Sequence, residues 1–268
     1  MSERDSQFVD IGADRSQPRL ARLAGRHRER APCHVLRSHV DRIWIFEVAP
    51  VCELELVPDG CIDVYWNGQQ LMVAGPSTGL LTVRTAAQQT FVGARFAPGV
   101  AYRWLGVSAC ELLNSHASLE DVWGMHVDTE AIDSLTTARD PAAVAAALER
   151  MLANRLNYVP PADPIIEATL GAARETRRGQ DIVRDMVNGF GWSERTLRRR
   201  CDQAFGYGPK TLDRILRFQR FLTLSQTSRS ALSHLAAAAG YADQSHLVRE
   251  VRRLAGQSPS RLLAELQT

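Results

Sequence analysis

The chain has 268 residues, 45% of them hydrophobic, which is enough for two domains that each bury a core. No run of about eighteen apolar residues occurs, so no membrane-spanning helix is expected. The five cysteines are odd in number, widely spaced and without a C-x-x-C pair. This usage argues against a disulfide framework or a structural zinc site and is typical of a reducing cytoplasm.

The net charge of +2 hides an asymmetry between the two ends of the chain. From Glu167 onward there are 17 Lys and Arg against 10 Asp and Glu, a net of +7. The preceding part holds 15 basic and 20 acidic residues, a net of −5. This asymmetry is expected if only the C-terminal part binds a polyanion such as nucleic acid. A positive surplus of this size also occurs on ordinary solvated surfaces.

The N-terminal half reads as a short tail followed by strands. Residues 1–30 alternate Arg with Asp and Glu and lack the apolar segment of a secretory signal, which predicts a flexible tail. Residues 42–48, 53–57 and 61–66 are short, partly alternating and rich in β-branched and aromatic side chains, which predicts strands. The turn signal at residues 58–60 separates two of them.

Helical patterns begin after these strands. Ser108 and Glu111 have the spacing of a capping box, and Asp140 followed by Pro141 opens a helix to about Leu156. Residues 159–164 contain three prolines and predict a linker. The fold class expected is α+β, with a β-rich effector-binding or dimerisation domain at 31–158 and an all-α domain at 165–268.

The second domain reads as helix throughout. Asp163 can cap a helix that starts at Pro164, and Gln180 with Asp181 opens the next. Ser193 caps a helix over 193–205, which Gly206 ends. Pro209 then starts a long helix to about residue 224.

These helices contain an internal duplication with an offset of fifty positions. The matching pairs are Leu197 with Leu247, Arg199 with Arg249, Gly206 with Gly256, and Pro209 with Pro259. Each copy reads as helix, tight turn with Gly, helix, Gly stop, and Pro restarting a helix. A short Gly-containing turn between two helices is typical of a helix-turn-helix unit.

In each copy polar residues face away from the apolar stripe. Solvated helix faces look the same, but the recurrence of outward Arg in two copies favours DNA recognition, since Arg, Gln and Ser can bind base edges in the major groove. The candidates for base reading are Arg195, Arg198, Arg199, Gln244, Ser245 and Arg249. The candidates for contact with the DNA backbone are Ser193, Thr196, Arg200, Asp243, His246 and Arg252.

Residues 180–266 resemble the AraC/XylS family of transcription regulators. The resemblance rests on residues 236–247 and 256–259 in the second copy, and on 193–199 and 205–209 in the first. It implies two helix-turn-helix units joined by a long helix. Leu247, Val251 and Cys201 stand where the family usually has Phe; the changes are apolar for apolar, but Cys201 leaves room for looser packing in the first unit.

The N-terminal half resembles a poorly characterised domain of such regulators over residues 56–64, 75–76 and 92–99. This resemblance implies a β-rich sensory or dimerising domain and names no ligand. The partners expected are double-stranded DNA, a second copy of the chain in a homodimer, a small-molecule effector and RNA polymerase. No membrane partner, cofactor, metal or catalytic residue is expected, and the location expected is cytoplasmic.

Four alternative sites are weighed against this interpretation. Residues 31–35 resemble the Pro-Cys-His site of alkylguanine-DNA alkyltransferases, so an alkylation-repair protein with Cys33 as acceptor is the second hypothesis; the usual Arg after that His is missing. A metal site is the next, from the residues Cys33, His34, His39, Cys52 and Cys61. A further alternative is a carboxylate pair formed by Asp59 and Asp63, but these residues fit a turn and a strand edge better. The last alternative is a ligand pocket lined by aromatic residues, but we favour a place in the core for them. These residues are Trp44, Tyr65, Trp66 and Trp104.

Overall fold

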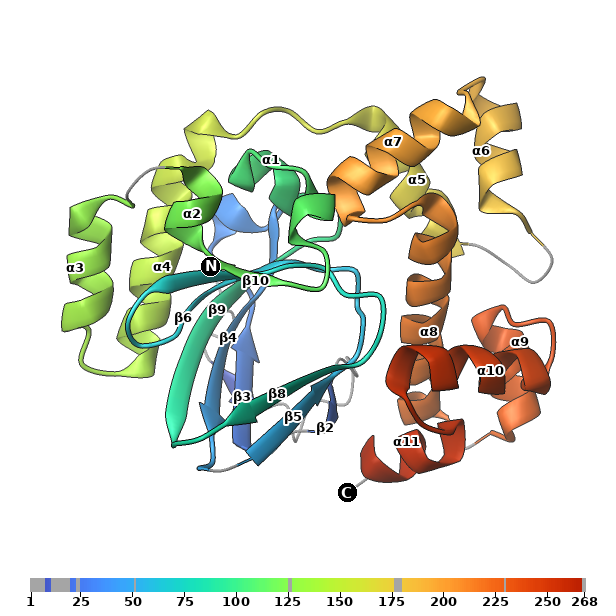
Figure 1. The fold of residues 1–268 in the computed structure, drawn as a ribbon, viewed down its shortest axis with the longest axis horizontal. Coiled ribbons are helices and arrows are strands. Elements are labelled where there is room, and N and C mark those ends of the chain that lie inside the picture. Colours follow the sequence, from blue (N-terminus) through green and yellow to red (C-terminus); the bar gives the residue numbers. More distant parts are fainter. Residues whose placement is uncertain are drawn as a thin grey trace.

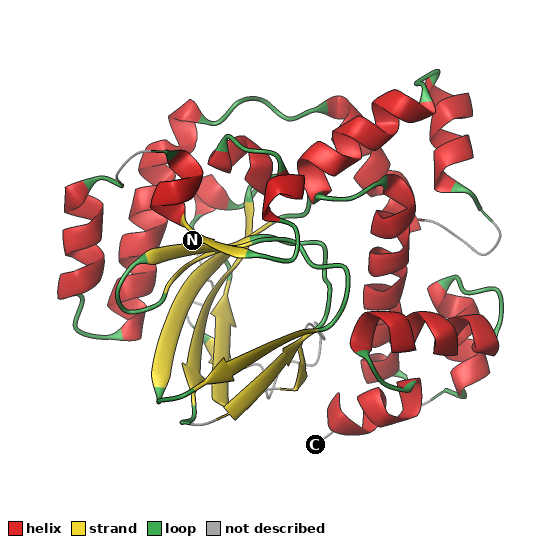
Figure 2. Cartoon of the chain, viewed as in Figure 1, coloured by secondary structure: helices red, strands yellow, loops and turns green. Residues whose placement is uncertain are grey.

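The computed structural model describes residues 8–10, 20–22, 25–50, 52–124, 127–175, 180–228 and 230–266. Strands fill the first half of the chain and helices the second (Figure 2). The strands are β1 (Val9–Asp10), β2 (Leu20–Arg22), β3 (Gly25–Arg30), β4 (Val40–Val48), β5 (Cys52–Leu56), β6 (Asp63–Trp66), β7 (Leu71–Ala74), β8 (Leu81–Thr85), β9 (Gln89–Phe96) and β10 (His116–Ser118).

The strands form two antiparallel sheets in the described part of the chain. The larger has the order β1-β3-β4-β9-β6-β7-β10, and the smaller has the order β2-β5-β8. The smaller sheet lies next to the larger one (Figure 1). A small apolar cluster of Phe46, Val48 and Leu54 joins the two. The other face of the larger sheet is covered by helices, where Ile43 and Ile45 pack with Leu148 of α4 (Pro141–Arg155).

The helices that accompany the sheets are short, except for α4. They are η2 (His34–Leu36), α1 (Ala101–Leu105), η3 (Ala109–Leu112), α2 (Leu119–Trp123), α3 (Thr129–Thr137), α4 (Pro141–Arg155) and η4 (Leu156–Tyr158). The capping box of Ser108 and Glu111 is present at η3, and Asp140 caps α4 by accepting the Ala143 N–H at 2.9 Å. Both local predictions are confirmed.

The remainder is helical, and no strand occurs in its described residues. The helices are α5 (Pro164–Glu175), α6 (Ile182–Phe190), α7 (Glu194–Phe205), α8 (Pro209–Thr227), α9 (Leu232–Ala239), α10 (Gln244–Ala255) and α11 (Pro259–Leu266). Asp163 accepts the Ile165 N–H at 2.9 Å and so begins α5 where the sequence predicts it. The long helix α8 is the centre around which the others gather (Figure 1).

Two sequence expectations need correction. Residues 25–30, assigned to a flexible tail, form β3, which pairs with β4 from Gly25 opposite Val48 to Arg30 opposite Ile43. The pattern hides this strand because its buried positions carry His27 and Glu29 rather than apolar side chains. The third predicted strand is also shorter than expected, because β6 begins at Asp63.

None of the described helices is long and apolar enough to cross a membrane.

Candidate nucleic-acid interface

The two helix-turn-helix units repeat each other with the offset seen in the sequence. Helices α7 and α10 have 12 residues each and begin fifty positions apart. Ser193 caps α7 by accepting the Thr196 N–H at 3.1 Å, and Asp243 caps α10 by accepting the His246 N–H at 2.7 Å. Gly206 and Gly256 end them with φ of 83° and 69°, a left-handed conformation that favours Gly.

The inward faces of both helices are buried. Leu197 and Cys201 in α7, like Leu247 and Val251 in α10, are each 0% exposed and belong to one continuous core. Burial raises the pKa of the Cys201 thiol to about 12, so this cysteine is a neutral core side chain. The substitutions relative to the family pattern therefore keep the apolar interior.

The six side chains predicted to read bases are all exposed. Arg195 and Arg199 are one turn apart on α7, and Ser245 and Arg249 hold the equivalent positions on α10. Arg198 has an exposed ion pair with Asp202, with 3.7 Å between Nε and Oδ2. Such a surface pair contributes little to stability, so it leaves Arg198 available to another anion.

The six residues predicted to contact the DNA backbone have mixed surroundings. Ser193 and Asp243 use their side-chain oxygens as caps, while Arg252 and, in part, Thr196 are open to solvent. His246 packs edge-on against Tyr241, with ring centroids 5.4 Å apart. Arg200 turns back toward the start of α5, where Nη1 lies 3.4 Å from Asp163 Oδ2.

Polar contacts attach the neighbouring helices to α8. Arg220 donates to the carbonyl of Ala239 at the end of α9 and to those of Ala173 and Arg174 at the end of α5. A cation at helix C-termini also stabilises their dipoles. Arg214 of α8 pairs with Glu250 of α10, with 3.0 Å between Nε and Oε2. These contacts hold helices of both units on one support.

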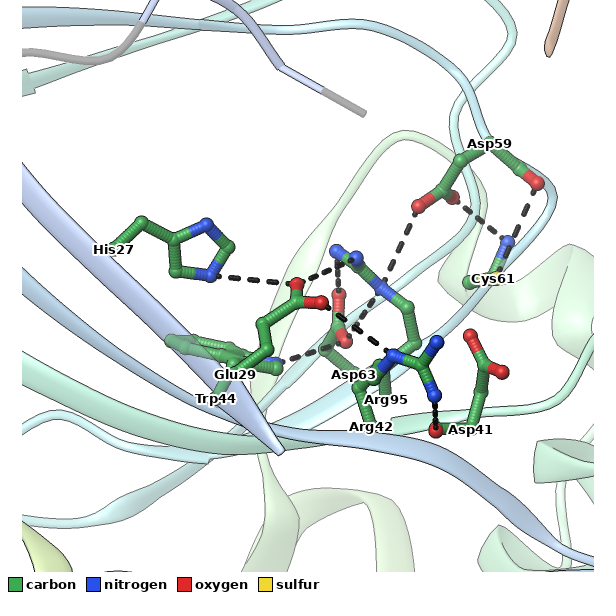
Figure 3. Close-up of polar contacts among 9 residues, drawn as sticks. All are labelled: His27, Glu29, Asp41, Arg42, Trp44, Asp59, Cys61, Asp63 and Arg95. Carbon is green, nitrogen blue, oxygen red and sulfur yellow. Dashed lines mark hydrogen bonds and ion pairs between the residues drawn. The ribbon is translucent and has the colours of Figure 1, made fainter. Parts of the chain in front are cut away.

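A cluster of charged side chains lies on the face of the larger sheet that turns away from the helices (Figure 3). Arg95 of β9 stands opposite Asp63 of β6 in the strand register, with 3.1 Å between its Nε and Asp63 Oδ1. The same Nε lies 3.5 Å from Asp59 Oδ2, and Arg95 Nη1 lies 3.9 Å from Glu29 Oε1. Arg42 reaches the other oxygen of Glu29 at 3.7 Å.

Burial and mutual charge shift the pKa values in this cluster. Burial raises the pKa of Asp63, an effect that the Arg95 guanidinium opposes. Burial lowers the pKa of Arg95, but the carboxylates of Asp63, Asp59 and Glu29 outweigh it and raise that pKa well above its usual range. Trp44 lies across Gly93, where a Cβ would be 2.3 Å from its ring, and donates its Nε1–H to Asp63 at 3.1 Å.

The aromatic residues divide between the two faces of this sheet. Trp66 and Trp104 lie in the helix-covered core, as the sequence interpretation favoured. Trp44 and Tyr65 are half-buried on the charged face, where their ring centroids are 6.1 Å apart and Phe91 contacts Tyr65.

The turn at residues 58–60 connects this cluster to the helical half of the chain. On one side Asp59 accepts the Cys61 N–H at 2.9 Å and pairs with Arg95. On the other, the Pro58 carbonyl accepts a hydrogen bond from Gln219 of α8. The Tyr207 hydroxyl, buried and without a hydrogen-bond partner in the described residues, points toward Gly60. Burial raises its pKa well above the usual value.

The sequence suggests two alternative sites, a metal site and an alkyl-accepting Cys33. No group of three or more potential ligands among the described residues could hold a metal ion, and the side chain of Cys52 lies outside them. Cys33 is exposed just before the three-residue η2, with its backbone N–H donating to Glu149 Oε1 at 2.7 Å.

Sequence reasoning missed the charged cluster and the contacts between the two halves. Asp59 and Asp63 were expected to serve a turn and a strand edge, which they do, but their common partner Arg95 lies more than thirty residues away. The available signal was Arg95 itself, because it is the only charged residue in the otherwise apolar segment 91–96.

Comparisons with known families match the two halves separately. A model described as a domain of unknown function (DUF6597) matches residues 28–118, and one described as a helix-turn-helix domain matches residues 186–265. No curated protein matches the chain.

Among solved structures, two of ToxT from Vibrio cholerae are similar. One is 9% identical, covers 84% of this chain and 98% of its own, and has a TM-score of 0.48. The other is 9% identical, covers 83% and 96%, and has a TM-score of 0.47. Similarity at this level carries no inference about function. The family match and the duplicated units together show that residues 186–265 form a helix-turn-helix domain, in agreement with the resemblance to the AraC/XylS regulators.

Proposed function

We propose that the chain is a sequence-specific transcription regulator that inserts α7 and α10 into successive major grooves on one face of DNA. The observation that carries this proposal is the duplicated, capped helix with exposed Arg on its outward face. Because a helix in the major groove reads bases mainly with its N-terminal residues, Arg195 and Arg199 in α7, like Ser245 and Arg249 in α10, are placed to do so. Arg198 and Gln244 complete the set.

The length of α8 supports reading of two grooves. Its 19 residues span about 28 Å, which is comparable with the ~34 Å between equivalent grooves on one face of the duplex. Arg252, Thr196 and His246 flank the proposed readers and would contact the phosphates. Arg200 pairs with Asp163, so it would reach a phosphate only by exchanging that carboxylate for it.

The N-terminal domain is proposed to bind a small effector and to dimerise. Support for an effector comes from the half-buried Trp44 and Tyr65 beside the partly exposed Asp63 and Arg95, because small-molecule sites combine aromatic walls with a few polar groups. Sedimentation of residues 1–158, a fragment that keeps β3 beside β4, tests dimerisation. A monomer at high micromolar concentration would exclude this role for the domain.

Footprinting of the full chain on selected genomic DNA tests the proposed function. We expect two protected segments about one helical turn apart on one face, and an affinity that falls steeply with salt because phosphate contacts release counterions. The fragment 160–268 should protect the same segments, since it contains both units and the basic surplus. Failure of the fragment to bind at low salt, while the full chain binds, would contradict the assignment of DNA binding to this domain.

A further inference from the structure

One loop of the N-terminal domain contacts the C-terminal ends of both proposed reading helices. Residues 76–80 connect β7 to β8. A methyl group built on Gly206, which ends α7, would lie 2.7 Å from Pro76 Cγ. A methyl group built on Gly256, which ends α10, would lie 3.2 Å from Leu80 Cδ2. Two equivalent positions of the repeat therefore meet residues only four apart in a single loop.

This loop is fixed within the N-terminal domain. The Asn114 N–H donates to the Pro76 carbonyl at 2.8 Å, and its side-chain oxygen accepts the Thr78 N–H at 3.0 Å. Gly75 donates to the Ser115 carbonyl at 2.9 Å. Asn114 has φ of 55°, and no other non-Gly residue of the described chain has a positive φ, so its backbone adopts a conformation that suits the bonds to the loop.

A second contact between the domains is made by the turn at residues 58–60. Gln219, in the middle of α8, donates its side-chain N–H to the Pro58 carbonyl at 2.6 Å, and Tyr207, in the turn before α8, is buried against Gly60. The N-terminal domain thus contacts the first unit, the connecting helix and the second unit.

The position of α10 relative to α7 would be loosely set by α8 alone. A bend of about 10° over the ~28 Å of α8 would displace the second unit by ~5 Å, more than the ~3.4 Å rise of one base pair. A contact at the far end of each reading helix removes this freedom without occupying the N-terminal faces that are exposed for DNA.

We propose that the loop at residues 76–80 sets the distance and orientation between α7 and α10, and thereby the spacing of the two base-pair segments that the regulator selects. Pro76, Leu80 and Asn114 are positioning residues in this proposal, since each acts through the helices rather than on DNA. The inference rests on the proposed function of α7 and α10 as readers.

Two variants of the full chain weaken the loop without touching the outward faces. Asn114→Gly removes the side-chain oxygen while Gly accepts the same φ. Leu80→Ala removes the side chain beside Gly256. Val83→Ala is the matched control, because Val83 lies on β8 but packs against the cluster of Phe46 and Leu54 inside the N-terminal domain. Thermal melts show that each variant is folded.

Affinity is measured on operators in which the two segments are moved one base pair closer or further apart. We expect the wild type and Val83→Ala to lose about tenfold in affinity when the spacing changes, as for a mismatched base pair. Asn114→Gly and Leu80→Ala should lose about threefold or less, with their affinity for a single segment unchanged. Full discrimination of spacing in both variants would overturn the proposal.

A second readout needs no DNA. Spin labels are placed at Gln203 and Arg253, exposed and equivalent positions of α7 and α10, through an unnatural amino acid that leaves Cys33 and Cys110 unlabelled. We expect a narrow distance distribution in the wild type and Val83→Ala, and a broader one in both loop variants. Unchanged distributions would overturn the proposal. A different result would count against the proposed function rather than against the loop. In that case the distances broaden in the loop variants, but the affinity of the wild type does not depend on segment spacing and Arg199→Ala binds DNA as tightly as the wild type.

Discussion

Ser193 and Asp243 cap the two proposed reading helices at positions fifty residues apart, one with a hydroxyl group and the other with a carboxylate. The carboxylate sits at the positive end of the α10 dipole and accepts the His246 N–H. The backbone hydrogen bond from His246, with smaller help from the charges of Arg249 and His246, lowers the pKa of Asp243 below its usual 3.8 despite slight desolvation. The same charge would face the phosphates of bound DNA.

Asp243→Asn separates the capping hydrogen bond of this side chain from its negative charge. Asn keeps a capping oxygen, so the variant should fold and should bind DNA more tightly at low salt because one negative charge is removed. Since the folded pKa is lowered, the charge stabilises the protein above pH 3.8 and this contribution is lost as the pH falls through the lowered value. The difference in Tm from the wild type should therefore be present at pH 7 and disappear in acid. A difference that stays constant with pH would contradict the assigned cap.

Leu247→Ala tests the core of the second unit. Leu247 is 0% exposed, so truncation should cost about 2–5 kcal/mol of unfolding free energy through lost burial and a cavity. Its neighbour Val248 is half-buried, and Val248→Ala should cost less than about 1 kcal/mol. Chemical denaturation of both variants measures the difference. Equal stabilities would mean that Leu247 does not lie in the core described.

Arg95→Met tests the buried charged cluster. Removal of the guanidinium leaves the carboxylates of Glu29, Asp59 and Asp63 close together, which should cost about 3–5 kcal/mol at neutral pH. This loss of unfolding free energy should shrink as the pH falls. Because the pKa of Asp63 is raised in the folded protein, the folded state binds a proton at a higher pH than the unfolded chain does. Arg84→Met is the control, since Arg84 pairs with Glu53 on an exposed surface and its loss should cost at most about 1 kcal/mol. Similar costs for the two would contradict a buried cluster.

The helical half could be predicted from the sequence because its signals are local. Ser193, Gly206 and Pro209 mark helix ends within a few residues, and the fifty-residue offset relates the two copies directly. The charged cluster could not be predicted in this way, since its members come from β3, β4, β6, β9 and a loop, and only the strand register brings Arg95 opposite Asp63. β3 was missed for a similar reason: its buried Glu29 pairs with Arg42 and Arg95 on other strands, and His27 lies beside Glu29.

Cys33→Ser tests the alternative of an alkyl acceptor. Cys33 is exposed at the start of a single turn, and its backbone N–H rather than its thiol is held by Glu149. We expect DNA binding and thermal stability to stay as in the wild type. Incubation with DNA carrying a labelled alkyl group provides the direct check. Label transferred to the wild-type chain and lost in Cys33→Ser would favour the repair function over the regulator.

The measurement closest to the central claim is a binding titration of Arg199→Ala and Arg249→Ala on operator and random DNA. Both side chains are exposed at equivalent positions of α7 and α10, so neither truncation should lower thermal stability. Each should weaken operator binding by about 1–3 kcal/mol and relax the preference at one base pair, while binding to random DNA changes much less. Folded variants that keep the full operator preference would show that α7 and α10 are not the reading helices.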